Sequence, residues 1–442
     1  MNDSPKPIGV GMIGCGTVGQ GVVKLLGGHR ADWYAQRLGR PLQLRRVLVR
    51  DTSAERGVNL AEGVVGDDPE SFFNDPDIDI VVEVAGGVEP VGRYVRRALE
   101  SGHHVVTANK ALLAARGAEL FALARAHQVC IAFEASCCGG IPVLAAIKFG
   151  LAANRIEAVY GILNGTCNFI LTQMSESGAG YDQALAEAQR LGFAEADPTL
   201  DVSGADAAQK LAIIASLAFG VSVHESDVTY LGIDTLAGED VQLGAELGYQ
   251  IKLLAVARRE GDGLLLRVEP CFLDRREHVA QVREAFNALS VYGHAAGSNM
   301  FVGHGAGQMP TASSVVGDLI NVAGGWYPHA FRTMRLWPDQ HEPAKVLDGA
   351  EARSRFYVRV SARDEPGVMA KLTAAFSRRS ISISSVLQHE ANGRGAPGFV
   401  PVVVTTYETT GGAMAEAARE IETLDVIDGD PVCIPIVELP AG

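Results

Sequence analysis

The sequence of 442 residues contains no run of lysines and arginines, no C-x-x-C pair and no apolar run long enough to span a bilayer. Its net charge of −14 argues against a nucleic-acid partner, because phosphate binding requires a basic surface. The odd number of cysteines, seven, predicts neither a disulfide framework nor a zinc site. The longest apolar stretch, residues 211–223, is too short for a membrane helix, and the N-terminal residues lack the layout of a signal peptide. We therefore expect a cytoplasmic protein with reduced thiols and no membrane partner.

The order of predicted strands and helices divides the chain into four segments and indicates the α/β class. In residues 1–142 apolar strands alternate with helices, which predicts a Rossmann-type, doubly wound parallel sheet. Residues 143–323 mix strands and helices as in an α+β domain. Residues 324–350, with scattered prolines, are predicted to form a linker that returns to the first segment. Residues 351–442 show the order βαββαβ of a ferredoxin-like domain.

A glycine-rich stretch, "GMIGCGTVGQG", follows the first predicted strand and opens a helix. In this G-x-G-x-x-G pattern, Gly14 permits a tight turn, Gly16 allows the backbone to approach a pyrophosphate, and Gly19 lets the helix pack on the sheet. The alternative is a glycine-rich turn without a ligand. Because the βαβ context is present, we favour a dinucleotide site, formed by Gly14, Gly16, Thr17, Val18 and Gly19.

The second predicted strand ends with Arg50 and Asp51, which favour different cofactors. Asp51 could bind a ribose 2′-hydroxyl and select NAD, whereas Arg50 could neutralise a 2′-phosphate and select NADP. We favour NADP, and keep open the alternative that Arg50 only faces solvent.

Two lysines lie where a nicotinamide site is expected. Lys110 in "TANKALLA" follows a strand of the parallel sheet, and ligands of such sheets bind at the carboxyl ends of the strands. Lys210 comes four residues after Asp206, so the two share one face of a predicted helix. A solvent-exposed ion pair is one interpretation. The apolar residues after Lys210 and the acids Glu195 and Asp201 before it favour another, a polar pocket for a cationic small molecule. A partly desolvated lysine could there move a hydroxyl proton during hydride transfer.

Beyond this reading, the sequence resembles homoserine dehydrogenase over its whole length. The motifs that carry the resemblance are "GMIGCGTVG", "TANKALLA", "EASCCGGIPVL", "GILNGTCNFIL", "LGFAEADPTLDVSGADAAQKLAIIA" and "GHGAGQMPTASSVVGDL". The resemblance implies NAD(P)-dependent interconversion of L-aspartate 4-semialdehyde and L-homoserine. It also implies that residues 143–323 serve catalysis and dimerisation, and that residues 351–442, with "DEPGVMAKLTAAF", form an ACT domain.

Residue roles follow from the same resemblance. Lys210 is expected to donate and accept the proton, and Lys110 to lie between nicotinamide and substrate. Substrate binding is expected from Glu195, Asp201, Asp206, Gly165 and Thr166, and further cofactor contacts from Gly86 and Gly307. A monovalent cation, sodium in most members, is expected on the backbone carbonyls of Glu134, Cys137, Gly139 and Ile141.

Regulation and assembly are further expectations. The ACT domain suggests an amino-acid effector such as threonine, and the resemblance suggests a homodimer or homotetramer. Two alternatives stay open: another Rossmann dehydrogenase of the sugar or inositol type, and a catalytically inactive amino-acid sensor.

Overall fold

The computed structural model describes residues 6–27, 30–389 and 398–440. These residues form two compact units, each assembled from three segments of the chain. The first unit comprises Met1–Glu157, Ala208–Val228 and Phe286–Ala344, and the second comprises Ala158–Ala207, Thr229–Ala285 and Lys345–Gly442.

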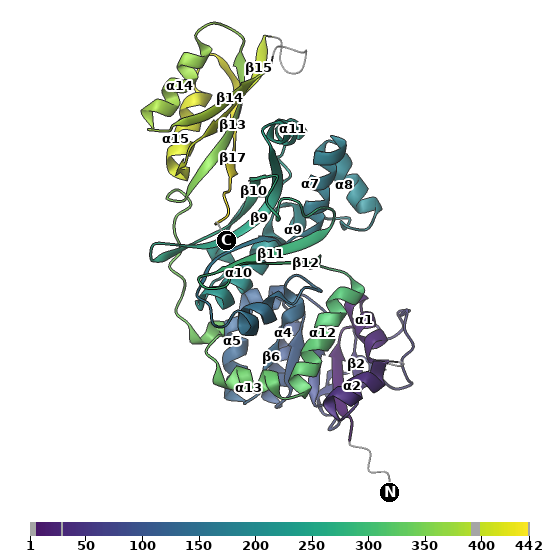
Figure 1. Cartoon of the computed structure of the whole chain (residues 1–442). Coiled ribbons are helices and arrows are strands. Elements are labelled where there is room, and N and C mark those ends of the chain that lie inside the picture. The colour runs from purple at the N-terminus through teal and green to yellow at the C-terminus, as the bar shows by residue number, and fades with distance from the viewer. Residues whose placement is uncertain (1–5, 28–29, 390–397, 441–442) are drawn as a thin grey trace. The chain divides into compact units, whose positions relative to one another are not determined.

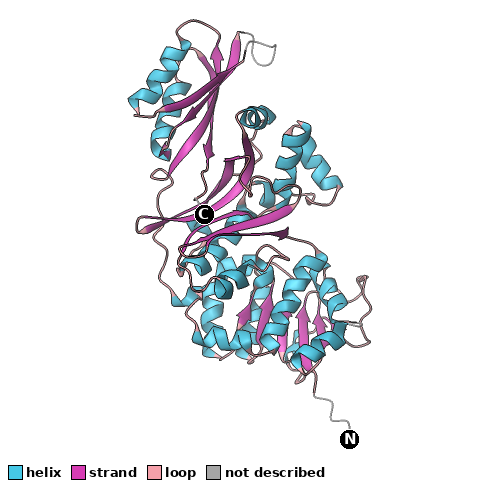
Figure 2. Cartoon of the chain, in the orientation of Figure 1, coloured by secondary structure: helices cyan, strands magenta, loops and turns pink. Residues whose placement is uncertain are grey.

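The first unit is built around a parallel sheet with the strand order β3-β2-β1-β4-β5-β6. The central strand β1 has the sequence IGVGMI, and all six of its residues are buried, as expected for a strand covered on both faces. Helices pack around this sheet (Figures 1 and 2). The predicted doubly wound α/β class is thus confirmed. The strands are β1 (Ile8–Ile13), β2 (Leu42–Leu48), β3 (Val65–Gly66), β4 (Ile80–Glu83), β5 (His104–Thr107) and β6 (Ile131–Ala132).

The helices of the first unit include several that begin directly after a strand of the sheet. They are α1 (Thr17–Leu26), α2 (Arg30–Leu38), α3 (Pro69–Phe73), α4 (Val91–Glu100), α5 (Lys110–Ala126), α6 (Val143–Ala145), α12 (Gln308–Ala323) and α13 (Trp326–Thr333). Shorter turns are η1 (Glu134–Ser136), η2 (Ala146–Gly150), η3 (Glu225–Asp227) and η4 (Pro338–Gln340), and β11 (Phe286–Gly293) and β12 (Gly297–His304) form an antiparallel hairpin. The boundary between the units falls within α10 (Ala205–Phe219), after Ala207.

Part of the segment predicted as a linker, residues 324–350, is packed into the first unit. It contains α13, and the fully buried Trp337 follows this helix. The Trp337 ring lies 4.8 Å from that of Phe331, 6.1 Å from that of Phe121 and 6.2 Å from that of Phe133, measured between centroids. Aromatic burial of this kind anchors the return of the chain to the first unit.

The second unit is built around a mixed sheet with the order β7-β9-β10-β17-β13-β15-β14. Its strands are β7 (Ile156–Ile162), β8 (Thr229–Tyr230), β9 (Tyr249–Glu260), β10 (Gly263–Asp274), β13 (Arg353–Arg363), β14 (Ile383–Gln388), β15 (Phe399–Thr406), β16 (Thr409–Thr410) and β17 (Ile427–Ile436). Its helices are α7 (Gly165–Ser177), α8 (Tyr181–Arg190), α9 (Thr199–Val202), α11 (Gly238–Glu246), α14 (Val368–Arg378) and α15 (Gly411–Glu422).

The C-terminal part of this unit has the predicted βαββαβ order, as β13, α14, β14, β15, α15 and β17, with the short β16 added before α15. The apolar faces of the two helices pack on one face of the sheet, through residues such as Leu372, Phe376 and Ile421. The ferredoxin-like domain is therefore confirmed.

A buried ion pair joins this C-terminal part to the rest of the second unit. Asp240 of α11, whose side chain is 1% exposed, accepts hydrogen bonds from Arg359 Nε at 2.5 Å and from Arg359 Nη2 at 2.9 Å. The Tyr357 hydroxyl donates to the same carboxylate at 3.0 Å. The fixed fork of the guanidinium matches the carboxylate, so the contact is both strong and directional.

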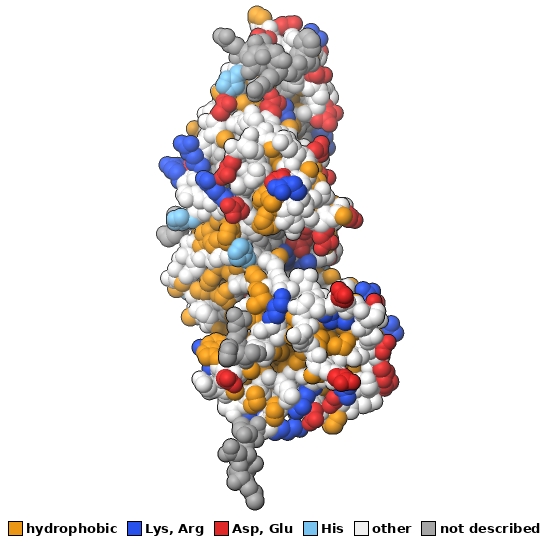
Figure 3. All heavy atoms as spheres, turned by 90° about the vertical axis from the view of Figure 1, so that its right-hand side faces the viewer, with side chains coloured by type: hydrophobic (Ala, Val, Ile, Leu, Met, Phe, Trp, Pro, Cys, Tyr) orange, Lys and Arg blue, Asp and Glu red, His pale blue; other side chains and the backbone are white. Residues whose placement is uncertain are grey.

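Surface charge is mixed. On the face drawn in Figure 3, acidic and basic side chains are interspersed. Among the described residues, no helix is both long and apolar enough to pass through a membrane.

Candidate active site

The glycine-rich turn between β1 and α1 has the backbone that the sequence pattern predicts. Gly14 has a φ of +92°, and a Cβ there would lie 2.7 Å from the backbone of Ala85. A Cβ on Gly19 would lie 2.7 Å from the Gly14 carbonyl oxygen, whereas one on Gly16 would meet nothing within 4 Å. Gly16 caps α1 without a side-chain hydrogen bond, so the first N–H groups of the helix remain available to an anion.

A cavity of about 760 Å³ adjoins this turn. Gly14, Gly16 and Gly86 lie on its wall, as do Arg50 and Asp51 from the end of β2. The glycines and the position of the cavity at the carboxyl ends of the strands suit a dinucleotide.

The Asp51 carboxylate is already engaged within its own loop. It accepts hydrogen bonds from the Ser53 hydroxyl at 2.6 Å and from the Ser53 N–H at 2.9 Å, and these bonds lower its pKa. Arg56, which sequence reasoning missed, donates to the Asp51 carbonyl oxygen at 2.5 Å and also lies on the cavity wall. Arg50 and Arg56 therefore both belong to the cavity wall near the end of β2, where a ribose is expected.

A buried carboxylate organises the loop after β4. Glu83 is fully buried, and burial raises its pKa. Its Oε2 accepts from the Thr107 hydroxyl at 2.6 Å, and its Oε1 accepts from the N–H groups of Ala85 at 2.9 Å and Gly86 at 3.0 Å. These bonds fix the loop that carries Gly86. Sequence reasoning missed this residue, although a glutamate within the apolar run "VVEVAGG" was visible.

Lys110 is placed at the same edge of the sheet by the neighbouring strand. Glu83 and Thr107 are paired at the ends of β4 and β5, and Asn109 caps α5 by accepting from the Leu112 N–H at 3.0 Å. The Asn109 amide also donates to the Gly87 carbonyl at 2.6 Å. Lys110, the first residue of α5, is half-buried. Lys110 and Gly86 thus lie at the edge of the parallel sheet where ligands of such sheets bind.

Gly307 caps α12, which packs beside α1. Its φ is +121°, which favours glycine, and Lys24 of α1 donates to the Gln308 side chain at 2.7 Å. A Cβ on Gly21 of α1 would lie 2.6 Å from the Gln308 carbonyl oxygen, so close packing requires glycine there.

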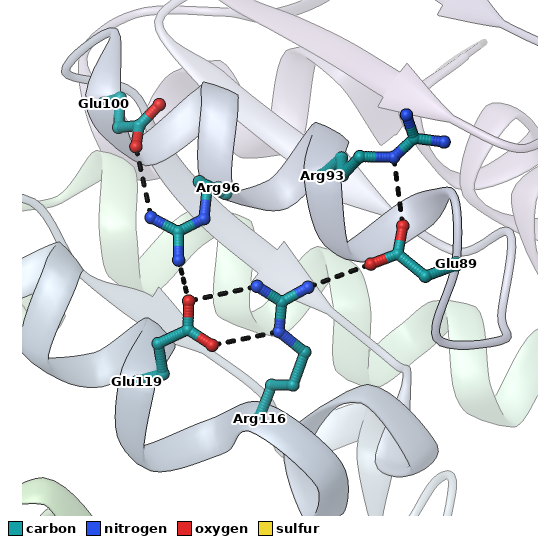
Figure 4. Close-up of polar contacts among 6 residues, drawn as sticks. All are labelled: Glu89, Arg93, Arg96, Glu100, Arg116 and Glu119. Carbon is teal, nitrogen blue, oxygen red and sulfur yellow. Dashed lines mark hydrogen bonds and ion pairs between the residues drawn. The ribbon is translucent and has the colours of Figure 1, made fainter.

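Ion pairs link α4 with α5 beside the cofactor cavity (Figure 4). Glu89, which lies on the cavity wall, accepts from Arg93 at 3.1 Å and from Arg116 at 3.0 Å. Arg116 also bonds to Glu119. Because these side chains are partly exposed, each pair stabilises the fold by no more than about 1 kcal/mol.

In the second unit, Asn164 joins two of the predicted substrate-binding acids. Its amide donates to Asp201 Oδ1 at 2.7 Å and to Asp206 Oδ2 at 2.9 Å. Its Oδ1 accepts from the Cys167 N–H and so caps α7. Thr166 Oγ1 lies 3.2 Å from Asp201 Oδ2 and 2.6 Å from the Phe193 carbonyl oxygen. Gly165 begins the same helix. Sequence reasoning missed Asn164.

The four acids between residues 195 and 206 differ in burial. Asp206 is only 4% exposed and Asp201 is half-buried, but Glu195 and Asp197 are exposed. Asp197 accepts from the Thr199 hydroxyl at 2.6 Å and from the Thr199 N–H at 3.1 Å, which lowers its pKa. The buried part of the cluster is therefore smaller than the sequence pattern predicted.

Lys210 lies one turn after Asp206 on α10 and is half-buried. The residues that follow it, among them Leu211 and Ile214, are fully buried. Lys210 is thus near the polar start of a helix that is otherwise apolar on most sides.

Hydrogen bonds, two of them to α12, hold the loop that is predicted to bind a cation. Glu134 donates its N–H to Asp318 at 2.8 Å, and its carboxylate accepts from the Leu144 N–H at 2.8 Å. The Gly139 carbonyl accepts from Ser314 at 2.7 Å, and the Ile141 carbonyl from the Val143 N–H at 2.8 Å.

The backbone carbonyl oxygens of this loop suit a hard cation. A hard cation prefers oxygen ligands to sulfur, so the Cys137 backbone carbonyl suits it better than the Cys137 thiol. No group of three or more potential side-chain ligands occurs in the described ranges. Each carbonyl oxygen has a second lone pair, so the residues present fit a cation held by the backbone.

Comparisons with known proteins decide the family. The family model "Homoserine dehydrogenase" matches residues 142–320, and "Homoserine dehydrogenase, NAD binding domain" matches residues 14–134. The homoserine dehydrogenase of Bacillus subtilis is 40% identical over 422 residues, with 96% of each chain covered. That of Pseudomonas aeruginosa is 41% identical, with 98% of this chain and 100% of the relative covered. The chain belongs to the homoserine dehydrogenase family.

Solved structures of the family agree. The homoserine dehydrogenase from Thiobacillus denitrificans is 42% identical, with a TM-score of 0.91 and coverage of 98% and 99% of the two chains. The enzyme from S. aureus is 32% identical, with a TM-score of 0.76. The family model "ACT domain" matches residues 356–424. The resemblance seen in the sequence is confirmed, and with it an NAD(P)-dependent oxidoreductase that interconverts L-aspartate 4-semialdehyde and L-homoserine. The sugar dehydrogenase and the inactive sensor are not favoured.

Proposed function

We propose that Lys210 moves the hydroxyl proton of homoserine while Asp206 holds the substrate. The observation that carries this proposal is the Asn164 amide, which fixes the Asp206 and Asp201 carboxylates one helical turn before Lys210. Asp206 is buried and accepts a hydrogen bond from Asn164, and its carboxylate has further lone pairs with which it would bind a substrate ammonium. The bound nicotinamide supplies or accepts the hydride.

The remaining residues orient the substrate. Glu195 and Asp201 bind its polar groups, and Gly165 and Thr166, at the N-terminus of α7, bind its carboxylate. Lys110, at the edge of the parallel sheet, lies between nicotinamide and substrate. Oxidation of L-homoserine by the purified protein, followed by the absorbance of the reduced cofactor, tests the assignment.

The cofactor is inferred to be NADP rather than NAD. Gly14, Gly16, Thr17, Val18 and Gly19 hold the pyrophosphate, and Gly86 and Gly307 bind nearer the nicotinamide. Arg50 and Arg56 both line the ribose end of the cavity, whereas the Asp51 carboxylate is bound to Ser53. Two arginines near this end of the cavity favour a 2′-phosphate.

Arg50→Ala is expected to lower the preference for NADP over NAD, expressed as the ratio of kcat/KM values, by about tenfold to a hundredfold. The loss corresponds to one charge-assisted hydrogen bond. Steady-state kinetics of homoserine oxidation with each cofactor measures it. Arg276→Ala, which removes an arginine 86% exposed in the second unit, serves as the control. If the ratio were unchanged in Arg50→Ala, Arg50 would face solvent and would not contact the 2′-phosphate.

The proposal also assigns a role to each segment of the chain. Residues 1–142 bind the nucleotide, and residues 143–323 serve catalysis and dimerisation. Residues 324–350 return the chain to the nucleotide domain, and residues 351–442 regulate the activity of the enzyme. A monovalent cation, sodium by preference, occupies the carbonyls of Glu134, Cys137, Gly139 and Ile141. The enzyme works in the cytoplasm as a homodimer or homotetramer.

Threonine is proposed as an effector of the ACT domain, at the loop before α14. There Gly367 has a φ of +92° and caps the helix, and Asp364 is exposed. Asp364→Ala should raise the threonine concentration that gives half-inhibition by about tenfold or more, because a carboxylate that binds an ammonium is lost. Glu365→Ala, next to it, should leave inhibition unchanged. Inhibition curves that are identical for wild type and Asp364→Ala would leave the domain a structural role.

A further inference from the structure

A closed ring of hydrogen bonds lies at the carboxyl ends of β4 and β5, beside the cofactor cavity. Thr107, the last residue of β5, is only 1% exposed and is paired with Glu83, the last residue of β4. The Thr107 hydroxyl donates to Glu83 Oε2 at 2.6 Å, and its oxygen accepts the Asn109 N–H at 3.0 Å. One hydroxyl therefore joins the end of β4 to the residue that caps α5.

The two ends of this connection meet again in the loop after β4. Glu83 Oε1 accepts the Gly86 N–H at 3.0 Å, and the Asn109 amide donates to the Gly87 carbonyl oxygen at 2.6 Å. Gly86 and Gly87 have φ angles of +73° and +79°, and both line the cofactor cavity. Residues other than glycine rarely adopt such angles, so the conformation of this loop depends on its glycines and on the ring of hydrogen bonds.

The same ring determines where the helix that carries Lys110 begins. Asn109 Oδ1 accepts the Leu112 N–H at 3.0 Å, so Asn109 is the N-cap of α5 as well as a member of the ring. Lys110 is the next residue along the chain. The Thr107 hydroxyl thus connects the loop of Gly86 with the start of α5.

Loss of this hydroxyl would leave two buried groups without their bond. The Glu83 carboxylate would lose a donor, and the Asn109 N–H would lose its acceptor. A polar group without a partner in the interior is costly, so both groups would move toward other partners. The loop and the start of α5 would then shift relative to each other, while the strands that carry them would remain paired.

We propose that Thr107 is a positioning residue for hydride transfer, because its hydroxyl fixes Lys110 relative to the loop that binds the nicotinamide. The inference rests on the roles proposed above for Lys110 and Gly86. Thr107 is not among the residues that line the cofactor cavity, so its effect on turnover would pass through these neighbours.

Two substitutions at Thr107 separate the hydroxyl from the packing of the side chain. Thr107→Val keeps the branched shape and removes the hydroxyl, whereas Thr107→Ser keeps the hydroxyl and removes a methyl group. Thr406→Val is the matched control, because Thr406 of β15 is also fully buried and its hydroxyl oxygen accepts the Phe356 N–H at 3.0 Å. Fluorescence titration with the reduced cofactor counts the binding sites of each variant, and kcat for homoserine oxidation is expressed per site. A variant that only folds poorly loses sites but keeps its turnover per site.

In Thr107→Val, kcat per site is expected to fall about tenfold to a hundredfold, the loss that a displacement of about 1 Å can cause. Thr107→Ser and Thr406→Val should keep a kcat per site close to that of the wild type. An unchanged kcat per site in Thr107→Val would overturn the proposal. So would an equal fall in Thr107→Ser, because packing and not the hydroxyl would then control turnover.

Asn109→Ser tests the ring if Thr107→Val yields too little folded protein. Serine is a good N-cap, so α5 keeps its start, but the amide that donates to the Gly87 carbonyl is lost. We expect kcat per site to fall by about tenfold for the same reason as in Thr107→Val. Turnover per site equal to that of the wild type would contradict the proposed ring.

A double-mutant cycle with Lys110→Ala separates this proposal from the proposed role of Lys110. If Thr107 acts through Lys110, Thr107→Val should lower kcat per site much less in the Lys110→Ala background than in the wild type. Equal falls in the two backgrounds would show that Thr107 does not act through Lys110, and would overturn the proposal. The role of Lys110 itself is judged from Lys110→Ala alone, which would leave kcat unchanged if that role were wrong.

Discussion

Replacement of Lys210 by alanine is expected to lower kcat for homoserine oxidation by about 10²–10⁴-fold, the range that a general acid or base contributes. Cofactor affinity should change little, because Lys210 is not among the residues of the dinucleotide cavity. The physical reason is that the hydroxyl proton must leave as the hydride departs, and water is a poor base at neutral pH. The Asp206 carboxylate, one turn earlier, would still bind the substrate ammonium, so KM should rise far less than kcat falls.

The measurement combines steady-state kinetics with a fluorescence titration of the reduced cofactor. Lys345→Ala is the matched control, since Lys345 is 63% exposed and pairs only with the exposed Asp262 among the contacts described for it. If Lys210→Ala kept near-normal turnover at neutral pH, Lys110 or water would have to donate and accept the proton instead.

Residues that act through their neighbours in sequence could be predicted without coordinates. The strand "IGVGMI" is uniformly apolar, and the glycines after it must turn sharply and pack closely, so the pattern alone indicated the dinucleotide turn. The helix cap at Asn109 and the position of Lys110 follow in the same way from the end of a buried strand.

Residues that act through distant partners could not be predicted. Glu83 is bound by Thr107, 24 positions away, and Asn164 binds Asp201 and Asp206, which lie 37 and 42 positions away. Nothing in the local sequence indicates such pairs, because they depend on how strands and helices meet. Nearness in sequence is also a poor guide to burial, because Asp197 is close to Asp201 in sequence but is exposed and bonded to Thr199.

Distant partners also explain why part of the predicted linker, residues 324–350, is buried. Prolines and polar residues around Trp337 are typical of an exposed connection. The ring is nevertheless fully buried, because Phe121 and Phe133, about two hundred positions earlier, complete its surroundings.

Asp240→Ala is expected to destabilise the second unit by about 3–5 kcal/mol. The variant would leave the Arg359 guanidinium, only 15% exposed, without its bidentate partner, and would remove the acceptor of the buried Tyr357 hydroxyl. Because an arginine in a protein does not lose its proton, this side chain stays charged in the variant and cannot escape the cost by deprotonation. Hydrogen exchange of β13 and α11 is the appropriate measurement, because a chain with several domains does not unfold in one step.

The adjacent glutamate provides a stringent control for this variant. Glu239 also pairs with Arg359, at 3.2 Å, but is 40% exposed, so Glu239→Ala should cost no more than about 1 kcal/mol. Removing both buried charges together, in Asp240→Leu with Arg359→Met, should recover most of the loss, because the penalty comes from the unpaired charge and not from the missing pair. If Asp240→Ala and Glu239→Ala had equal effects, the buried Asp240–Arg359 pair would stabilise the contact between α11 and β13 no more than an exposed ion pair does.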